Sequence, residues 1–477
     1  MFPSSNFCPG PVSRRSFLRF GGLSMLGMSM ADALRFKAMA ASQPAALRDT
    51  SVIFIWLPGG PPHMETYDMK PDAPAEYRGL FRPIKTNVPG MEISEMFPLQ
   101  AKIADKFNII RSVHHDFADH GGGHKRFLTG RIPAQPTGTV NDAPAVTSIV
   151  NKCLSDNGGF KDGMPPVVCG VDQGRQGVDT FALGSAYLGS ATTPFIIAGN
   201  PSDADFKVQN LGLSRQMETR LNDRMALLKG MDKLRRDVDA AGTMTAMDSF
   251  SQRAFEMLTN NAVRDAFDLS KEPKEVRERY GMTAYGQRGL MARRLVEAGC
   301  RFVDMVWENP FPGKPMPKDC SYNWDSHAVN CHLYNDARWR FPVYDQAVSA
   351  LIEDLYARGL DKQTMLIVTG EFGRTPKLSQ SIGTASKVMQ PGRDHWAGAM
   401  SMIVAGGGMR TGQIIGATNS KGEYPVERPL TPNDLWATVY QHLGIDYTRN
   451  FLDHQGRPMP ILPFGEPIDE ILPAGVA

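Results

Sequence analysis

Runs of hydrophobic residues, each about as long as a buried strand, recur along the chain. An unbroken apolar run covers residues 51–57, and shorter ones follow at 107–110, 166–169, 195–198, 301–306, 365–368 and 400–405. Apolar runs without polar alternation are typical of strands that are buried on both faces, as in parallel sheets. The pattern therefore predicts a central, mostly parallel sheet.

Hydrophobic residues at helical spacing predict helices between these strands. The clearest helix precedes the 365–368 strand and ends near Gly359, because its apolar residues recur every three or four positions: Tyr344, Val348, Leu351, Ile352 and Leu355. Thr431 followed by Pro432 predicts a capped helix that runs to about Leu443. Strands alternating with helices predict a three-layer α/β/α domain.

One region departs from this alternation. From about 205 to 290 the sequence is charged and rich in helix formers, and apolar residues continue at helical spacing, as in 224–238 and 247–258. A further helix is expected at 287–297. We therefore predict a helical insertion, at about 205–290, within a single α/β domain that spans residues 42–477.

The first 41 residues have the features of an export signal. Arg14 and Arg15 precede a moderately apolar run over 20–30, and Ala38 and Ala40 offer small residues for cleavage. This arrangement resembles a twin-arginine signal, although an uncleaved amphipathic helix would also fit. No later segment reaches the ~18 apolar residues of a membrane span. We expect export by the twin-arginine machinery to the periplasm or cell surface of a bacterium, without a membrane span.

Composition and charge indicate the class of protein and exclude one class of partner. Hydrophobic residues make up 42% and charged residues 21% of the chain, as in globular proteins. The net charge is +2, and removing the first 41 residues takes away five basic and one acidic side chain, which leaves 47 basic and 49 acidic. Nucleic-acid binding needs a basic surface, so nucleic acid is not an expected partner.

Five cysteines lie beyond the predicted signal, and none belongs to a Cys-x-x-Cys pair: Cys153, Cys169, Cys300, Cys320 and Cys331. The sequence therefore predicts no thiolate zinc site. Cys320 and Cys331 could pair in an oxidising compartment, and buried free thiols are the other interpretation.

Histidines and carboxylates gather in four clusters, each after a predicted strand or in a loop. The clusters are His63 with Glu65 and Asp68; His114, His115, Asp116, His120 and His124; Asp325 with His327 and His332; and Glu371 with Asp394 and His395. Open α/β sheets place their sites at the carboxyl ends of the strands, so we expect the clusters to converge. Each cluster alone also fits a solvated loop. Together they predict a site for a divalent ion such as Zn²⁺, Mn²⁺ or Ca²⁺.

A series of motifs follows in one order along the chain: Leu57-Pro-Gly-Gly60 with His63, Leu128-Thr-Gly130, Ala266-Phe-Asp-Leu-Ser270, Arg279-Tyr-Gly281, Ala292-Arg-Arg-Leu-Val-Glu-Ala-Gly299, Trp324-Asp-Ser-His327, Gly370-Glu-Phe-Gly-Arg-Thr-Pro376 and Gly392-Arg-Asp-His-Trp396. With these motifs the chain resembles the DUF1501 family of exported bacterial proteins, which are related to sulfatases and the alkaline phosphatase superfamily. The resemblance implies a sulfatase-like fold and a metal-dependent hydrolase of phosphate or sulfate esters.

The chain departs from the sulfatase pattern where the chemistry is expected. Sulfatases carry a Cys-x-Pro-Ser-Arg-x-x-x-Leu-Thr-Gly stretch whose cysteine becomes the nucleophile. Counting back from Gly130 puts His120 at the place of that cysteine and His124 at the place of the arginine. Glu371 would replace a metal-binding aspartate, and Phe372 stands where a histidine is expected. Without Ser, Thr or Cys at position 120, the resemblance implies hydrolysis through a metal-bound water, with direct attack by His120 as the other mechanism.

Gly59 or Gly60 likewise stands at the place of an acidic ligand after the first strand, with His63 and Glu65 as substitutes. The predicted metal ligands are His63, Glu65, Asp325, His327, Glu371 and His395, and the predicted catalytic residues are His120 and His124. Arg374 and Arg393 are predicted to bind the anion, because guanidinium pairs bidentately with phosphate or sulfate.

The expected substrate is an ester, either a small molecule or a polysaccharide. Two alternatives remain open from the sequence. One is a non-catalytic cell-envelope protein that keeps the fold for binding or scaffolding, which the missing nucleophile favours. The other is a carbohydrate-binding surface, which would need exposed rings at Trp324 and Trp396.

Overall fold

An eight-stranded sheet lies at the centre of the structure, a computed structural model that describes residues 47–138, 140–157, 163–172, 183–208 and 260–473. The strand order is β14-β4-β13-β8-β1-β7-β5-β6. The strands are β1 (Ser51–Trp56), β4 (Phe107–Val113), β5 (Val167–Val171), β6 (Phe195–Ala198), β7 (Phe302–Val306), β8 (Thr364–Thr369), β13 (Met400–Gly406) and β14 (Ile414–Ile415). Each apolar run identified in the sequence forms one of these strands.

The sheet is mostly parallel, as predicted. β1 pairs in parallel with β7 and β8, β5 with β6 and β7, and β14 with β4. β13 is the exception, because it is antiparallel to both β4 and β8. Its seven residues are all buried, so its apolar run looks like those of its parallel neighbours and gives no sign of its direction.

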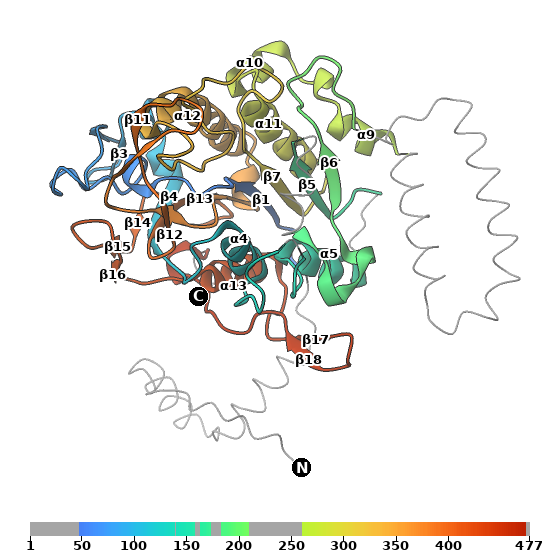
Figure 1. Cartoon of the computed structure of the whole chain (residues 1–477). Coiled ribbons are helices and arrows are strands. Elements are labelled where there is room, and N and C mark those ends of the chain that lie inside the picture. Colours follow the sequence, from blue (N-terminus) through green and yellow to red (C-terminus); the bar gives the residue numbers. More distant parts are fainter. Residues whose placement is uncertain (1–46, 139, 158–162, 173–182, 209–259, 474–477) are drawn as a thin grey trace, which may run out of the picture. The chain divides into compact units, whose positions relative to one another are not determined.

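Helices cover both faces of the sheet and confirm the three-layer α/β/α architecture (Figure 1). One face carries α10 (Lys274–Tyr280), α11 (Ala284–Glu297) and α12 (Leu333–Ala357), and the other carries α4 (His120–Thr129), α5 (Val146–Asp156) and α13 (Pro432–Leu443). Successive residues of β1 alternate between the layers, as the two-residue period of a strand requires. Ile53 and Ile55 belong to the apolar cluster with α11 and α12, whereas Phe54 belongs to the cluster with α4, α5 and α13.

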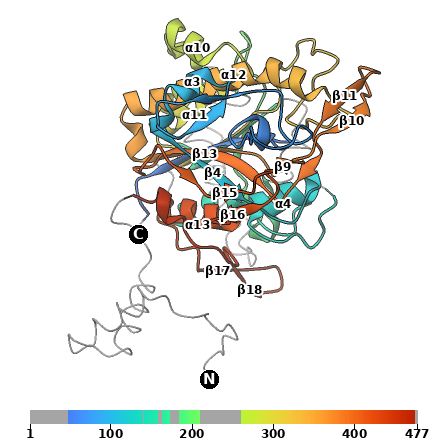
Figure 2. The same ribbon diagram turned by 90° about the vertical axis from the view of Figure 1, so that its left-hand side faces the viewer.

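Short elements complete the fold. They are α3 (Pro98–Ala101), α9 (Asn261–Phe267) and the strand pairs β2 (Pro83–Lys85) with β3 (Glu92–Ser94), β9 (Gly373–Arg374) with β12 (His395–Trp396), β10 (Ser379–Ile382) with β11 (Met389–Gly392), β15 (Ala417–Thr418) with β16 (Pro425–Glu427), and β17 (Asn450–Leu452) with β18 (Pro458–Pro460). The 3-10 helices are His63–Glu65 (η1), Ala104–Lys106, Ala186–Leu188, Ser190–Thr192, Leu269–Lys271, Leu360–Lys362 and Asp469–Ile471. The β10–β11 hairpin projects from the body of the protein (Figure 2).

The helix ends are predicted correctly where the sequence contains a recognisable capping motif. Thr431 and Asp434 form a capping box at the start of α13, and Gly444 ends that helix in the left-handed conformation. The helix predicted around Tyr344 begins earlier, at Leu333, and continues through Pro342.

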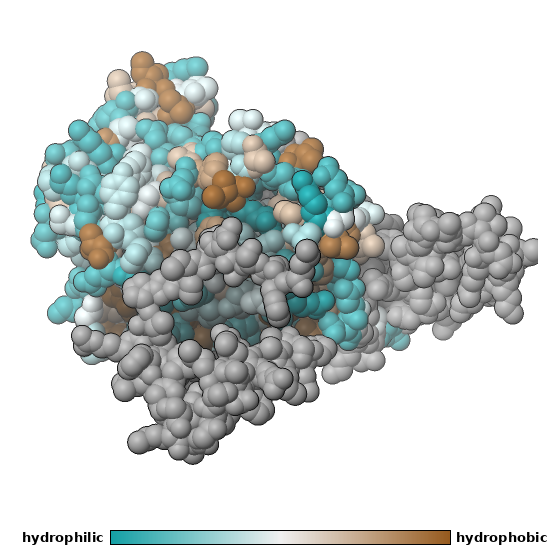
Figure 3. Space-filling view, turned by 90° about the horizontal axis from the view of Figure 1, so that it is seen from below, coloured by the Kyte–Doolittle hydropathy of each residue, from teal (hydrophilic) through white to brown (hydrophobic). Residues whose placement is uncertain are grey.

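The predicted signal, residues 1–41, lies outside the described residues, as do the expected helices at 224–238 and 247–258. The described end of the expected insertion contains α9, α10 and the beginning of α11. Within the described residues, no helix combines the length and apolar character that crossing a membrane requires. On the face shown in Figure 3, hydrophobic residues lie in small groups among hydrophilic ones, which is ordinary for a protein surface.

Candidate metal centre

The loops at one edge of the sheet bring three histidines and an aspartate together. His120 follows β4, and Asp325 and His327 lie in the loop after β7. His395 precedes β13, whose antiparallel direction puts its beginning at the edge where β4 and β7 end. The four residues are distant in sequence, and the sheet topology makes them neighbours.

Asp325 lies at the centre of this outer group. Its Oδ1 is 2.8 Å from Nε2 of His327 and 3.1 Å from Nε2 of His395. Its Oδ2 is 3.3 Å from Nε2 of His120. The two Nε2 atoms of His327 and His395 are themselves 2.8 Å apart. These four side chains offer ligand atoms that all lie within 4.8 Å of one another, close enough to surround one ion.

Two neighbours orient the outer group. Nδ1 of His327 lies 3.0 Å from Oδ1 of Asp394, so the ring donates to a carboxylate there and turns Nε2 toward Asp325. A carboxylate behind the distal nitrogen is the usual arrangement around metal-binding histidines. Nη2 of Arg374 donates to Oδ1 of Asp325 at 2.6 Å and fixes that carboxylate.

Glu371 forms an inner group on the other side of His120. This residue follows β8 and is completely buried. Its Oε1 lies 2.9 Å from Nδ1 of His120 and 3.6 Å from Nε2 of His124. The backbone N–H of Gly59 donates to both Glu371 oxygens, at 2.8 and 3.1 Å. His120, His124 and Glu371 thus make a second set of ligand atoms within 4.8 Å of one another.

The protonation of these residues follows from burial and from their contacts. Burial lowers the pKa of His124 and of His395, which leaves both rings neutral at pH 7, the form that binds metal. Burial also acts to lower the pKa of His120, but its contacts with Asp325 and Glu371 raise it to about 9.

The two carboxylates are ionised. Burial opposes ionisation of Glu371, yet the neighbouring His124 and His120 lower its pKa to about 2. Burial likewise opposes ionisation of Asp325, while hydrogen bonds from the three surrounding imidazoles hold its pKa far below the usual range. Both groups therefore offer an anionic oxygen to a cation.

Two predicted ligands, His63 and Glu65, lie in η1 and join neither group. His63 donates through Nε2 to the carbonyl of Gly422 at 2.9 Å, and its Nδ1 accepts the backbone N–H of Arg374 at 3.4 Å. Glu65 accepts from the guanidinium of Arg393 at 2.8 to 3.0 Å, and both of these side chains are completely buried. The structure therefore gives His63 and Glu65 protein partners in place of an ion.

The predicted anion-binding arginines are also buried. Arg374 and Arg393 have no exposed side-chain area. Besides Asp325, Arg374 donates to the carbonyls of Gly59, Gly60, Trp324 and Arg393. Besides Glu65, Arg393 donates to the carbonyls of Tyr77, Thr375 and Pro376. The structure does not bring either guanidinium to a surface that an anion could reach; both hold the loops around the site.

Three residues outside the predicted set of ligands and catalytic groups also shape the site, and the sequence names them without these roles: Gly59, His115 and Asp394. Gly59 has a φ of +108°, and a Cβ there would lie 2.5 Å from the backbone of Asp325, so only glycine fits while its N–H holds Glu371. His115 donates to the carbonyl of Glu371 and fixes the loop. Asp394 positions His327. The sequence signal for Gly59 is its position in the Pro58-Gly-Gly-Pro61 turn after the first strand. The roles of His115 and Asp394 depend on tertiary contacts, which the sequence does not show.

Two other sequence interpretations are settled by burial. The five cysteines beyond the predicted signal are buried free thiols. Trp324 is 2% exposed and its Nε1 donates to the carbonyl of Trp307 at 2.7 Å. Trp396 is half-buried and donates to the carbonyl of Glu423. The pair of exposed rings that a carbohydrate-binding surface needs is therefore not formed.

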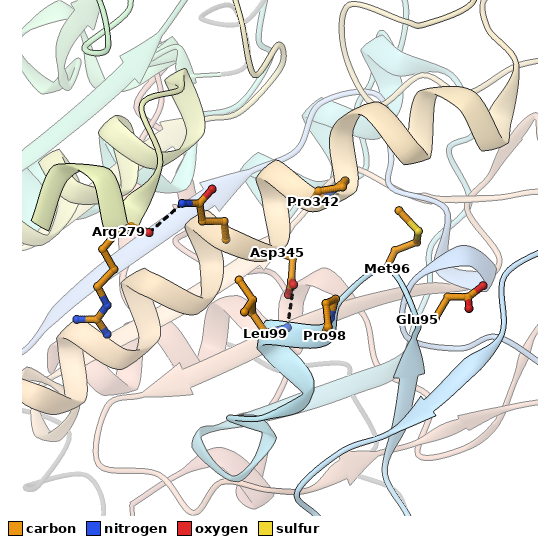
Figure 4. Close-up of a pocket in the computed structure, with 8 residues that line it drawn as sticks. Glu95, Met96, Pro98, Leu99, Arg279, Pro342 and Asp345 are labelled. Atoms are coloured by element: carbon orange, nitrogen blue, oxygen red, sulfur yellow. Dashed lines mark hydrogen bonds between the residues drawn. The ribbon is translucent and has the colours of Figure 1, made fainter. Parts of the chain in front are cut away.

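A hollow of about 460 Å³ lies elsewhere, between α3, α10 and α12 (Figure 4). Asp345 points into this region and accepts the backbone N–H groups of Leu99 and Gln100, at 2.9 Å each. Arg279 and Pro342 also line the hollow. None of its lining residues belongs to the outer or the inner group, so the metal centre is a separate feature.

Comparisons with known proteins agree with the motifs in the sequence. The family model described as "Protein of unknown function (DUF1501)" matches residues 49–472. No curated protein matches the chain.

Three solved structures illustrate what the fold is similar to. PsFucS1 sulfatase from Pseudoalteromonas sp. shares 12% identity over 91% of this chain and 72% of its own, with a TM-score of 0.38. Phosphonate monoester hydrolase SpPMH from Silicibacter pomeroyi shares 11% over 88% and 76%, with a TM-score of 0.38. The C-terminal periplasmic domain of EcEptC from Escherichia coli, in complex with Zn, shares 12% over 88% and 95%, with a TM-score of 0.36. At such low similarity, chemistry has to be argued from this chain's own side chains.

Proposed function

The chain belongs to the DUF1501 family, and we propose that it is an exported, metal-dependent hydrolase that acts on phosphate or sulfate esters. The observation that carries this proposal is the outer group, in which Asp325, His327, His395 and His120 converge on one point. The paired arginines at 14 and 15 support export by the twin-arginine route.

The outer group fits a divalent transition ion. One carboxylate with two or three imidazoles is a donor set that suits Zn²⁺ or Mn²⁺, whereas Ca²⁺ takes six to eight oxygen ligands. His395 is neutral because burial lowers its pKa, and Asp394 turns Nε2 of His327 toward the group. When bound, such an ion supplies Lewis-acid chemistry, by polarising an ester oxygen and acidifying water.

The outer group is open to a substrate. The side chains of Asp325, His327 and His395 are 13%, 19% and 17% exposed, and that of His120 is 37% exposed. Solvent therefore reaches part of each of these four side chains, whereas Glu371 is completely buried.

The contacts of His120 argue against a side-chain nucleophile. Position 120 has no hydroxyl or thiol, and both ring nitrogens face carboxylates: Nε2 faces Asp325 and Nδ1 faces Glu371. A ring held in this way does not present a free lone pair to phosphorus. Water is therefore the proposed nucleophile. His124 was also predicted to be catalytic, but its side chain is only 11% exposed and packs on Trp56, away from solvent.

The proposal is tested on the purified exported protein by metal analysis and by a screen of generic phosphate and sulfate esters. We expect bound Zn²⁺ or Mn²⁺ and hydrolysis of at least one ester class, and His327→Ala should lose the ion held at Asp325 and, with it, the turnover. His454→Ala is the matched control, since His454 is exposed and lies outside both groups. Absence of bound metal would overturn the proposal. Bound metal without turnover of any ester would favour the non-catalytic binding protein.

A further inference from the structure

We propose that the centre holds two cations, and that the imidazole of His120 is shared between them. The outer cation is the one that the proposed function requires, and this inference rests on that site. The inner cation would be bound by Nδ1 of His120, Nε2 of His124 and Oε1 of Glu371. Zn²⁺ is the ion that this mixture of imidazole and carboxylate suits best.

The two faces of His120 carry the argument. Its Nε2 lies 3.3 Å from Asp325, and its Nδ1 lies 2.9 Å from Glu371. Each carboxylate has further histidines of its own: His327 and His395 lie beside Asp325, and His124 lies beside Glu371. The outer and inner groups share no residue except His120. Because the two nitrogens of the ring point in different directions, the ring can bind one ion on each side as an imidazolate, and the N–H protons that now face the two carboxylates are released to solvent when the ions replace them.

The sequence of α4 builds the inner group. His120 and His124 are four residues apart on one helix, so their side chains lie on the same helix face. Two histidines at this spacing on a helix can bind one zinc ion, as in the His-Glu-x-x-His motif. With Glu371 they supply three protein ligands, the number found in zinc sites that keep a fourth position open.

Backbone groups prepare Glu371 for this role. The N–H of Gly59 holds both carboxylate oxygens, and His115 donates to the Glu371 carbonyl. Gly123 lets α4 approach closely, because a Cβ at that position would lie 2.9 Å from the ring of Phe372 and 3.3 Å from Cγ of Glu371. The carboxylate is therefore fixed in place against the helix that carries both histidines.

Charge in the interior favours an inner cation. Glu371 is completely buried, and its Oε1 lies 3.6 Å from Nε2 of His124. Taking carboxylates out of water is costly unless positive charge compensates them. The ring of Trp56, 5.6 Å from that of His124, closes the inner group off on one side. A divalent ion would compensate the buried carboxylate of Glu371 in a site that water screens poorly.

The test measures zinc stoichiometry on the full exported chain after chelation and reloading, by calorimetric titration with elemental analysis. We expect two zinc ions per chain in the wild type and in His454→Ala. One ion should remain in His124→Ala, which removes the inner group, and one in His327→Ala, which removes the outer group. His120→Ala should weaken both binding events.

A second readout needs no variant to fold. Two Cu²⁺ ions joined through one imidazolate, the deprotonated form of the ring, couple magnetically, so the copper-loaded wild type should lose most of the isolated Cu²⁺ resonance signal. One zinc per chain, unchanged in His124→Ala, would overturn the inner site and leave the proposed function standing. No bound zinc at all would overturn both. Two zinc ions with fully uncoupled Cu²⁺ signals would overturn the shared ring.

Discussion

At the scale of single residues, one carboxylate orients a predicted metal ligand without binding the ion itself. Asp394 lies behind His327, and its side chain is 57% exposed. A carboxylate in this position typically contributes 10–100-fold to metal affinity. We therefore predict that Asp394→Asn lowers zinc affinity by about 10–100-fold, measured by titration calorimetry, without changing the folded structure.

Asp265→Asn is the matched control, because Asp265 has the same 57% exposure and forms an ion pair with Lys271. That variant should bind zinc like the wild type. Equal affinities in Asp394→Asn and the wild type would contradict a positioning role for Asp394.

Asp304 lies in β7 and is buried in the interior of the sheet. Its Oδ1 has no hydrogen-bond partner among the described residues, and its Oδ2 lies 4.0 Å from Sγ of Cys169. Burial raises the pKa of Asp304 to about 8. The folded protein therefore binds a proton that the unfolded chain has released, throughout the range from about pH 4 to pH 8.

The sign of the effect on stability follows from this difference. The contribution of Asp304 is fully present below its unfolded pKa and is lost as pH rises toward 8. We predict that the free energy of unfolding of Asp304→Asn rises relative to the wild type by on the order of 1 kcal/mol per pH unit between pH 5 and pH 7. Urea unfolding of both proteins at several pH values measures it. A difference that does not vary with pH would show that the carboxyl group is not protonated in the folded state.

At the scale of elements, a buried ion pair ties η1 to the loop between β11 and β12. Arg393 and Glu65 are both completely buried and 2.8 Å apart. Removing one partner of such a pair leaves an uncompensated charge, which costs about 3–5 kcal/mol. We predict a loss of that size in the free energy of unfolding of Arg393→Met, measured with urea.

The double variant Arg393→Met with Glu65→Gln should recover part of the loss, since no charge then remains buried. The pair of Arg457, whose side chain is 67% exposed, with Asp453 provides the control. Arg457→Met should cost about 0–1 kcal/mol. If Arg393→Met cost as little as the control, the ion pair would not be a structural clamp.

The sequence predicts the elements better than it predicts the partners of charged residues. Apolar runs identify the strands because a doubly buried strand accommodates few polar residues. Such a run does not reveal the direction of its strand, which is why the sequence does not distinguish β13 as antiparallel. Asp325, His327, His395 and Glu371 were proposed together because each follows or precedes a strand at the same edge. Arg374 and Arg393 flank turns, and the sequence does not distinguish an exposed arginine from a buried one at such a position. Whether the side chain is buried depends on how the loops pack.

At the scale of the whole molecule, metal binding and folding are coupled. An ion that binds only the folded protein stabilises it by about 2.7 kcal/mol per site at a free concentration 100 times its dissociation constant. We predict that chelation lowers the Tm of the wild type, that added Zn²⁺ restores it, and that the Tm rises with zinc concentration. Differential scanning calorimetry measures the shift. His327→Ala should lose much of this zinc dependence, and an equal response in both proteins would show that zinc acts elsewhere.

Loops around one edge of the sheet form the proposed metal centre at Asp325. The most direct measurement is a crystal structure of the zinc-loaded protein, with anomalous diffraction recorded on both sides of the zinc absorption edge. We predict an anomalous peak about 2.0–2.2 Å from the carboxylate of Asp325 and from Nε2 of His327 and His395. A zinc-loaded crystal with no anomalous peak between these side chains would contradict it.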